Sequence, residues 1–155
     1  MKIDYNELKE EIEDFFEKNK TLVLATSAND KVSARMIEFV NIGLTLMFET
    51  DKRSGKFKQI MKNPNVAVCA KNVQIEGIAS VGEHPMDGSN MPFIELYKKH
   101  HQYAFQLYSH LENSIVIKIK PTLVTLWKNV DGQPFQDFLF VNEQKAERVC
   151  YDISK

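Results

Sequence analysis

Hydrophobic residues recur at three- and four-residue steps at the start of the chain, and they alternate with polar residues along most of the remaining sequence. The first pattern predicts an amphipathic helix that begins after Asp4, a good capping residue. Its apolar face comprises Tyr5, Leu8, Ile12, Phe15 and Phe16. Because the charged residues fall on the opposite face, we expect this helix to pack on the rest of the protein.

From Thr21 onward the period changes, and β-branched and aromatic residues become frequent. Turn-forming residues divide this region into short segments that predict strands. The expected strands are Thr21–Ser27, Val32–Asn41, Leu44–Thr50, Asn65–Lys71 and Val73–Val81. A short helix from Ser54 to Lys62 separates the third from the fourth. We therefore expect a five-stranded antiparallel meander interrupted by one helix.

Helical spacing returns between Asn90 and Leu111, which predicts one or two helices. The alternating segments Ser114–Lys120 and Leu123–Lys128 lie on either side of Pro121 and predict a pair of strands. The tail predicts one short strand around residues 138–140. The expected fold is mainly β, a six- to seven-stranded antiparallel split barrel with flanking helices. No linker or repeat divides the sequence, so residues 1–155 are expected to form one domain.

The composition fits an ordinary globular domain. The 155 residues are 43% hydrophobic, which is enough for a core without disulfides or metal. With 20 basic and 21 acidic residues, the net charge is −1, so no broad field attracts nucleic acid or an anionic membrane. The first twenty residues resemble no signal segment, and we expect a soluble, cytoplasmic protein. Cys69 lies in an apolar run and is expected to be buried and reduced.

Residues 50–56 lead from the third expected strand into the short helix and have the composition of an anion site. Ser54 is a good N-cap, so the first N–H groups of the helix point outward without intrahelical partners. Lys56 adds a positive charge beside them, and a phosphate monoester would satisfy both features. The residue types are equally typical of a capped, solvated helix start.

Arg35 lies in the middle of the second expected strand, on the same face as Ile37 and Phe39. A guanidinium on an apolar face needs a partner, and a carboxylate in a structural ion pair is the commoner solution. A bound phosphate is the alternative, because the planar group can donate two hydrogen bonds to it. If the second and third strands form a hairpin, Arg35, Ser54 and Lys56 can converge.

Five segments between Thr21 and Val81 follow one another in a specific order and spacing. They are Leu22–Thr26, Arg35–Phe39, Phe48–Lys56, Asn63–Val68 and Gln74–Ala79. Any one of them is a weak signal, but the five in register resemble the pyridoxamine 5′-phosphate oxidase-like split-barrel flavoproteins. The resemblance implies a homodimer that binds FMN at its subunit interface.

Transferred residue by residue, the resemblance implies that Arg35 and Lys56 hold the FMN phosphate, with Ser54 and the Gly55 amide completing the cradle. The backbone of residues 36–39 would run along the flavin edge, where its N–H and C=O groups can pair with the ring. The cofactor-binding set implied in this way is Arg35, Met36, Ile37, Glu38, Thr50, Ser54, Gly55, Lys56, Asn72, Gln74 and Trp127.

The remaining members of this set would contact the ribityl chain or the ring. Thr50 would bond the ribityl chain or the ring edge. Asn72 or Gln74, which share one face of the fifth strand, would contact the ring from the side. Trp127 corresponds in placement to an aromatic residue that such folds contribute from the second subunit, although a lone core tryptophan is an equally typical interpretation.

The sequence also departs from the family pattern. Authentic pyridoxamine phosphate oxidases end in a segment with arginine and histidine that grips the substrate phosphate. Residues 144–155 contain one arginine and no histidine. We therefore do not expect pyridoxamine phosphate to be the substrate. Glu49 and Val40 replace residues that touch the cofactor in the full oxidases, which indicates a simpler flavin site.

The four histidines, His84, His100, His101 and His110, fall close together in the sequence. Adjacent His100 and His101 cannot share a helix face, so we expect no metal site. They are more typical of a surface or interface helix, where one can line a substrate pocket.

The leading hypothesis is an FMN-dependent oxidoreductase that transfers hydride through the flavin to or from a small molecule, with no catalytic side chain assigned. The alternative is a non-catalytic flavin or haem carrier or sensor on the same barrel. Within the enzyme class, a deazaflavin could replace FMN.

Overall fold

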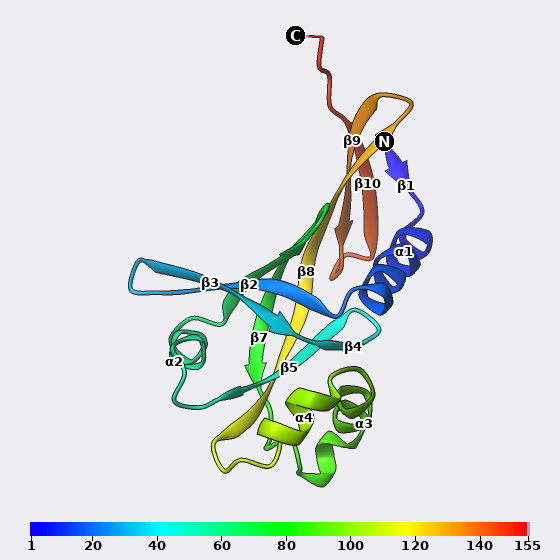
Figure 1. The fold of residues 1–155 in the computed structure, drawn as a ribbon. Helices are drawn as coiled ribbons and strands as arrows, with labels where there is room; N and C mark the ends of the chain where they lie inside the picture. The colour runs from blue at the N-terminus through cyan, green and yellow to red at the C-terminus, as the bar shows by residue number, and fades with distance from the viewer. Residues whose placement is uncertain (155) are drawn as a thin grey trace.

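The computed structural model describes residues 1–154 and confirms the mainly β class, an antiparallel sheet with flanking helices (Figure 1). The helices are α1 (Tyr5–Lys18), α2 (Gly55–Lys62), α3 (Met91–His100) and α4 (Gln102–Tyr108), with a 3₁₀ turn at Gly88–Asn90. The strands are β1 (Lys2–Ile3), β2 (Thr21–Ala28), β3 (Lys31–Glu38), β4 (Val40–Ile42), β5 (Thr45–Asp51), β6 (Asn65–Ala70), β7 (Val73–Val81), β8 (Ser114–Val130), β9 (Gln133–Phe140) and β10 (Lys145–Cys150). No helix among these residues is long and apolar enough to span a membrane.

Strand β8 organises the barrel because one of its edges serves two neighbours. Ser114–Ile119 pairs with β5, and Leu123–Val130 pairs with β9, while β7 runs along the other edge. Pro121 lies where the neighbouring strand changes from β5 to β9. Proline has no backbone N–H, so no donor is left unpaired at this position. The expected pair of strands around Pro121 is therefore wrong. The segment is one continuous strand, with a shift in the β7–β8 register between Glu76 and Gly77.

The segment expected as one strand from Val32 to Asn41 is divided at Phe39. Before it, β3 pairs with β2; after it, β4 pairs with β5. The Phe39 side chain is fully buried, and its amide donates to the Lys20 carbonyl at 3.1 Å. Consequently β5 lies beside β4 and β8 rather than β3, and β6 returns to pair with β2. The simple meander predicted for this region is wrong.

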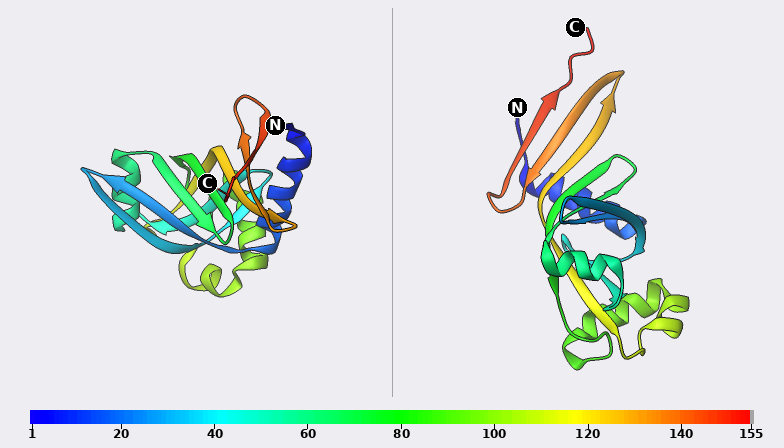
Figure 2. Two further views of the ribbon diagram at one scale, coloured as in Figure 1. Left: turned by 90° about the horizontal axis from the view of Figure 1, so that it is seen from above. Right: turned by 90° about the vertical axis from the view of Figure 1, so that its left-hand side faces the viewer.

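The tail forms two long strands rather than the single short one expected. Together with β1 they raise the number of strands among residues 1–154 to ten, instead of six or seven. This extension projects from the end of the molecule opposite α3 and α4 (Figure 2). Asp137, fully buried within it, accepts hydrogen bonds from Arg148 at 2.7 and 2.8 Å and pairs with Lys128 at 2.8 Å. Two cations thus compensate the buried carboxylate.

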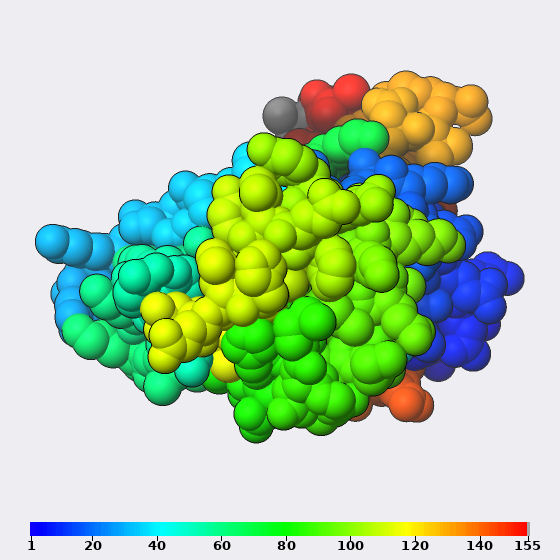
Figure 3. All heavy atoms as spheres, turned by 60° about the horizontal axis from the view of Figure 1, so that its bottom comes forward, coloured from blue at the N-terminus to red at the C-terminus, as the bar shows by residue number. Residues whose placement is uncertain are grey.

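The apolar residues form two clusters. The larger one fills the barrel and includes the inner face of α1. The smaller one lies outside the barrel wall, where α3 and α4 pack on β4, β5 and β8; its members are Val40, Met47, Phe93, Tyr97, Ala104 and Val116. Figure 3 shows these helices covering one end of the molecule, between the β2–β3 hairpin and α1. The two helices are therefore held on the outer surface of the strands that lead to α2.

Cys69 is exposed, so the expectation that it is buried is wrong. In β6 the side chains of Val66 and Val68 point inward, and the two-residue period places Cys69 on the outer face opposite Gln74. The apolar run suggests burial on both faces of the strand, whereas only one face is covered.

Gly77 provides a test of the close approach between β7 and the bend in β8. A Cβ atom there would lie 2.9 Å from Ile119 Cγ2 and 2.9 Å from the Lys120 carbonyl oxygen, which as backbone cannot rotate away. We expect Gly77→Ala to lower the free energy of unfolding by about 1–3 kcal/mol in urea titrations. Gly88→Ala is the control, because nothing lies within 4 Å of its Cβ position. Equal stability of the two variants would contradict the proposed crowding.

Candidate functional site

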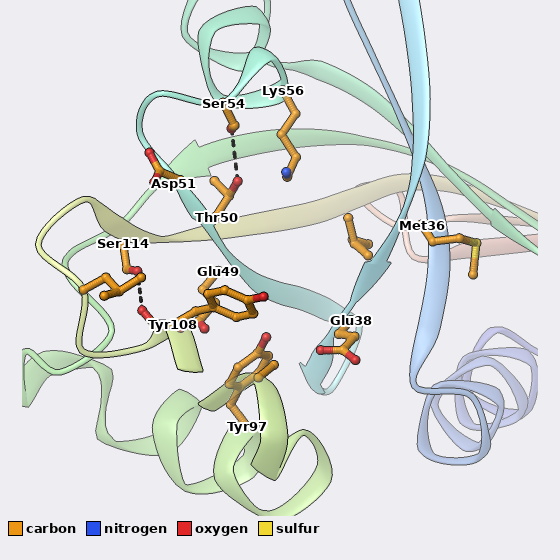
Figure 4. A pocket seen from close by; sticks show the side chains of 13 residues that line it. Met36, Glu38, Glu49, Thr50, Asp51, Ser54, Lys56, Tyr97, Tyr108 and Ser114 are labelled. Atoms are coloured by element: carbon orange, nitrogen blue, oxygen red, sulfur yellow. Dashed lines mark hydrogen bonds between the residues drawn. The ribbon is translucent and has the colours of Figure 1, made fainter. Parts of the chain in front are cut away.

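A cavity of about 370 Å³ lies between β3, β5, the start of α2 and the α3–α4 pair (Figure 4). Three separate parts of the chain build it. The division of the chain at Phe39 places β3 and β5 along one wall of the cavity. The smaller apolar cluster holds α3 and α4 against the opposite wall. It is lined by Met36, Ile37, Glu38, Glu49, Thr50, Asp51, Ser54, Lys56, Tyr97, Ala104, Tyr108, Leu111 and Ser114. The lining includes most of the residues expected from the sequence.

One end of the cavity is the start of α2. Ser54 is the N-cap, and its hydroxyl accepts from the Phe57 amide at 3.3 Å and lies 3.1 Å from the Thr50 hydroxyl. The amides of Gly55 and Lys56 donate to no other group within residues 1–154. They are the free N–H groups of a helix start, which favour an anion.

Two cations accompany these amides. Lys56 points into the cavity (Figure 4), and Arg35 donates to the buried Thr26 hydroxyl at 2.7 Å. Thr26 in turn donates to Gln59 of α2 at 2.5 Å, which connects Arg35 to the helix that carries Lys56. Burial lowers the pKa of both cations, and the charge of Arg35 lowers the pKa of Lys56 further.

Neither Arg35 nor Lys56 has a carboxylate within 4.0 Å among the described residues. The commoner alternative for Arg35, a structural ion pair, is therefore wrong. Asp51 does line the cavity, but Arg53 binds its carboxylate through the side chain at 2.7 and 3.0 Å. These hydrogen bonds lower the pKa of Asp51 to about 2. The cations near α2 thus have no ion-pair partner within 4.0 Å among residues 1–154, and the more distant charge of Asp51 only partly offsets the lowering of the Lys56 pKa.

Five of the expected residues are not in the lining. Arg35 and Gly55 are sequence neighbours of lining residues on β3 and at the start of α2, whereas the other three lie elsewhere. Asn72 belongs to the turn before β7 rather than to the strand, and its side chain donates to the Trp127 carbonyl at 2.8 Å. Gln74 follows on the same exposed face. Trp127 is 42% exposed, and its ring makes an edge-to-face contact with Tyr151. The structure brings these three residues together, but none of them lines this cavity. Trp127 is not a buried core residue.

The opposite end of the cavity is acidic, and the sequence did not predict this role. Glu49 projects from β5, and its carboxylate accepts from the Ser109 hydroxyl at 2.8 and 3.0 Å. Burial raises the pKa of Glu49 to about 7; the Ser109 hydrogen bond opposes this shift and the charge of Glu38 reinforces it. The sequence does contain a signal for this role, because Glu49 is a carboxylate inside the apolar run of β5. In the sequence this carboxylate is recognised only as a departure from the family pattern.

The histidines do not enter the cavity. His101 is buried between α3 and the barrel, where its Nε2 atom lies 2.7 Å from the Phe39 carbonyl oxygen. His84 bonds the Leu111 carbonyl at 2.8 Å, outside the lining. Within residues 1–154, no three or more His, Cys, Asp or Glu side chains are grouped so as to hold a metal ion.

The fold defines the class of protein as a split β-barrel, and the start of α2 with its unpaired amides lies at one end of its cavity. Residues 8–128 match the pyridoxamine 5′-phosphate oxidase family. Because this match covers more than half of the sequence, the chain belongs to that family. No match was found among curated proteins.

Solved structures share the fold. General Stress Protein 26 from Bacillus anthracis is 28% identical, covering 76% of this chain and 91% of its own, with a TM-score of 0.61. A pyridoxamine 5′-phosphate oxidase-related, FMN-binding protein from Nostoc punctiforme is 15% identical, covering 95% and 94%, with a TM-score of 0.61. The haem storage protein HutZ from Vibrio cholerae is 20% identical, covering 74% and 89%, with a TM-score of 0.62. The same fold thus occurs in flavin-binding and haem-binding proteins.

The raised pKa of Glu49 predicts a pH-dependent stability. Between the ordinary value of 4.5 and the folded value of about 7, the folded protein holds a proton that the unfolded chain has released. Stability from this group is therefore complete below about pH 4.5 and is lost as the pH rises through 7. Glu49→Gln keeps an acceptor for Ser109 and should remove this loss.

We expect the stability of Glu49→Gln relative to wild type to increase between about pH 5 and pH 8, measured by urea unfolding at each pH. Glu95→Gln is the matched control, because Glu95 is exposed on α3 and lies outside the cavity. A Glu49→Gln difference that stays constant across the range would show that this carboxyl titrates normally.

Proposed function

We propose that this protein is an FMN-binding oxidoreductase that transfers hydride through the flavin to or from a small molecule. The observation that carries the proposal is the pair of cations, Arg35 and Lys56, without a close carboxylate, beside the free amides at the start of α2. A phosphate monoester supplies the missing negative charge and accepts hydrogen bonds from all of these groups. Bound FMN supplies the hydride chemistry.

The residues present fit the rest of such a cofactor. Thr50, beside the Ser54 cap, is placed for the ribityl chain or the ring edge. Met36, Ile37 and Glu38 line the same wall, so their backbone groups can follow the edge of the ring. We assign no catalytic side chain to this wall, since its proposed role is to bind and orient the flavin.

The proposed assembly is a homodimer with flavin at the interface. Asn72, Gln74 and Trp127 form a group on an exposed face remote from the cavity lining, so they can contact a flavin only if it is bound by a second subunit. Met36, which lines the cavity, is 62% exposed, and Val32 near the other end of β3 is 75% exposed, so this strand presents apolar surface for a partner to cover. The partner proposed for this surface is a second copy of the chain.

Haem binding is the second candidate function, because HutZ shares the fold. The described lining residues include no histidine to ligate iron, whereas they include a helix start and a lysine suited to phosphate. The visible absorption spectrum of the purified protein distinguishes flavin, deazaflavin and haem. Bleaching of a bound flavin by NADH or NADPH without oxygen would separate an oxidoreductase from a carrier.

The phosphate assignment predicts the effect of removing each cation. Arg35→Ala and Lys56→Ala should each weaken FMN binding by about 1.5–3 kcal/mol, the range for a hydrogen bond to a charged group, as measured by quenching of FMN fluorescence. Lys58→Ala is the control, because Lys58 is exposed on the same helix and does not line the cavity. If both cavity variants bind FMN like wild type, the phosphate lies elsewhere.

The dimer predicts complementation between two defective subunits. Trp127→Ala should weaken FMN binding although Trp127 lies outside the cavity of its own protomer. In a mixed dimer of Trp127→Ala and Lys56→Ala subunits, one site carries both defects and the other carries neither. We expect unfolding and refolding the two variants together to restore wild-type affinity to a fraction of the sites. Failure of every mixture to recover tight sites would contradict a flavin shared between subunits.

A further inference from the structure

The acidic end of the cavity has charges that the flavin phosphate does not use. Glu49 accepts its side-chain hydrogen bonds from Ser109, and no cation lies within 4.0 Å of it among the described residues. Glu38 faces the same space, and its nearest basic group is His101, whose Nδ1 atom lies 3.9 Å from the carboxylate. Two carboxylates therefore line one end of the cavity, and the only basic group within 4.0 Å of either one among the described residues is His101.

Tyr97 supplies a second, independent observation. Its side chain is only 3% exposed, yet its hydroxyl makes no hydrogen bond within residues 1–154. Figure 4 shows this hydroxyl directed into the cavity, toward Glu38 and the ring of Tyr108. Burial, followed by the charges of Glu49 and Glu38, raises the pKa of the Tyr97 phenol. A hydroxyl that stays protonated, on a buried side chain, and faces an open space is available to a ligand.

The chemistry of this end differs from that of the α2 end. Carboxylate and phenol oxygens accept hydrogen bonds, and a cation that donates to them would also relieve the repulsion between Glu38 and Glu49. Flat N–H-rich cations pair with carboxylates through two parallel hydrogen bonds, and aromatic rings attract them. The rings of Tyr97 and Tyr108 provide such surfaces.

From these features we infer that the acidic end, comprising Glu38, Glu49 and Tyr97, binds a planar organic cation of the amidinium or guanidinium class. This inference rests on the proposed function, in which FMN phosphate occupies the α2 end and the second ligand lies beside the flavin. On this inference, the two carboxylates select the second ligand by its positive charge.

Three probes of the same shape test the inference on the wild-type protein saturated with FMN. Benzamidine is cationic, benzamide is neutral and benzoate is anionic, so isothermal titration isolates the effect of charge. We expect benzamidine to bind at least about tenfold more tightly than benzamide, the value of one charge-assisted hydrogen bond, and benzoate to bind weakest. Benzamide binding as tightly as benzamidine would overturn the inference without any variant.

Variants then locate the site. Glu49→Gln should reduce the affinity for benzamidine about tenfold, and Tyr97→Phe about threefold, while FMN affinity stays within about twofold of wild type. Glu38→Gln should also reduce the affinity for benzamidine, and Glu95→Gln, on the exposed face of α3, should change nothing.

The outcomes separate this inference from the proposed function. If FMN binds but Glu49→Gln and Glu38→Gln leave benzamidine affinity unchanged, the cation site is wrong and the flavin site stands. If Glu49→Gln weakens FMN as much as benzamidine, the carboxylate serves the flavin ring, which also overturns the inference. If FMN does not bind at all, the proposed function fails, and titration of the cofactor-free protein with the three probes still tests the preference for a cation.

Discussion

The backbone of β8 imposes the constraint on which the rest of the structure depends. One edge of this strand must satisfy two different neighbours, β5 at its start and β9 at its end, while β7 continues along the other edge. A strand has one donor and one acceptor for each residue, so the change of neighbour must occur where a missing donor costs little. Pro121 meets that condition. The barrel and the C-terminal extension consequently share a single strand, and each positions the other.

Charge is divided within the cavity rather than balanced. Beside one end, Arg35 and Lys56 have no carboxylate within 4.0 Å among the described residues. At the other end, Glu49 has no cation of those residues within that distance, and Glu38 has only His101, at 3.9 Å. Elsewhere the same chain compensates a buried charge fully, since Asp137 binds both Lys128 and Arg148. At the cavity, burial lowers the pKa of Lys56 and raises the pKa of Glu49, whereas in the extension opposite charges hold the strands together.

The features that the sequence predicted well are local ones. The Ser54 cap, the helix after it and the inward face of Arg35 follow from neighbouring residues and from strand periodicity. The errors arose where contacts between residues far apart in the sequence determine the structure. In the sequence, Phe39 is indistinguishable from an ordinary strand residue; only the structure shows that it is buried between β3 and β4 and separates them. Glu49 becomes unusual only after α3 and α4 close over it. Trp127 and its neighbours lie away from the cavity, and their assignment to the flavin depends on a second subunit.

The length of β8 has a geometric consequence for the proposed dimer. Ser114 lines the cavity at the start of the strand, and Trp127 lies thirteen positions further on, about 43 Å along the strand at the usual rise of 3.3 Å per residue. If Trp127 contacts the flavin of the partner, each β8 reaches from its own cofactor to the other one. In that case the length of β8 would set the spacing between the two bound flavins. An insertion in β8 would change that spacing and shift the barrel register at the same time.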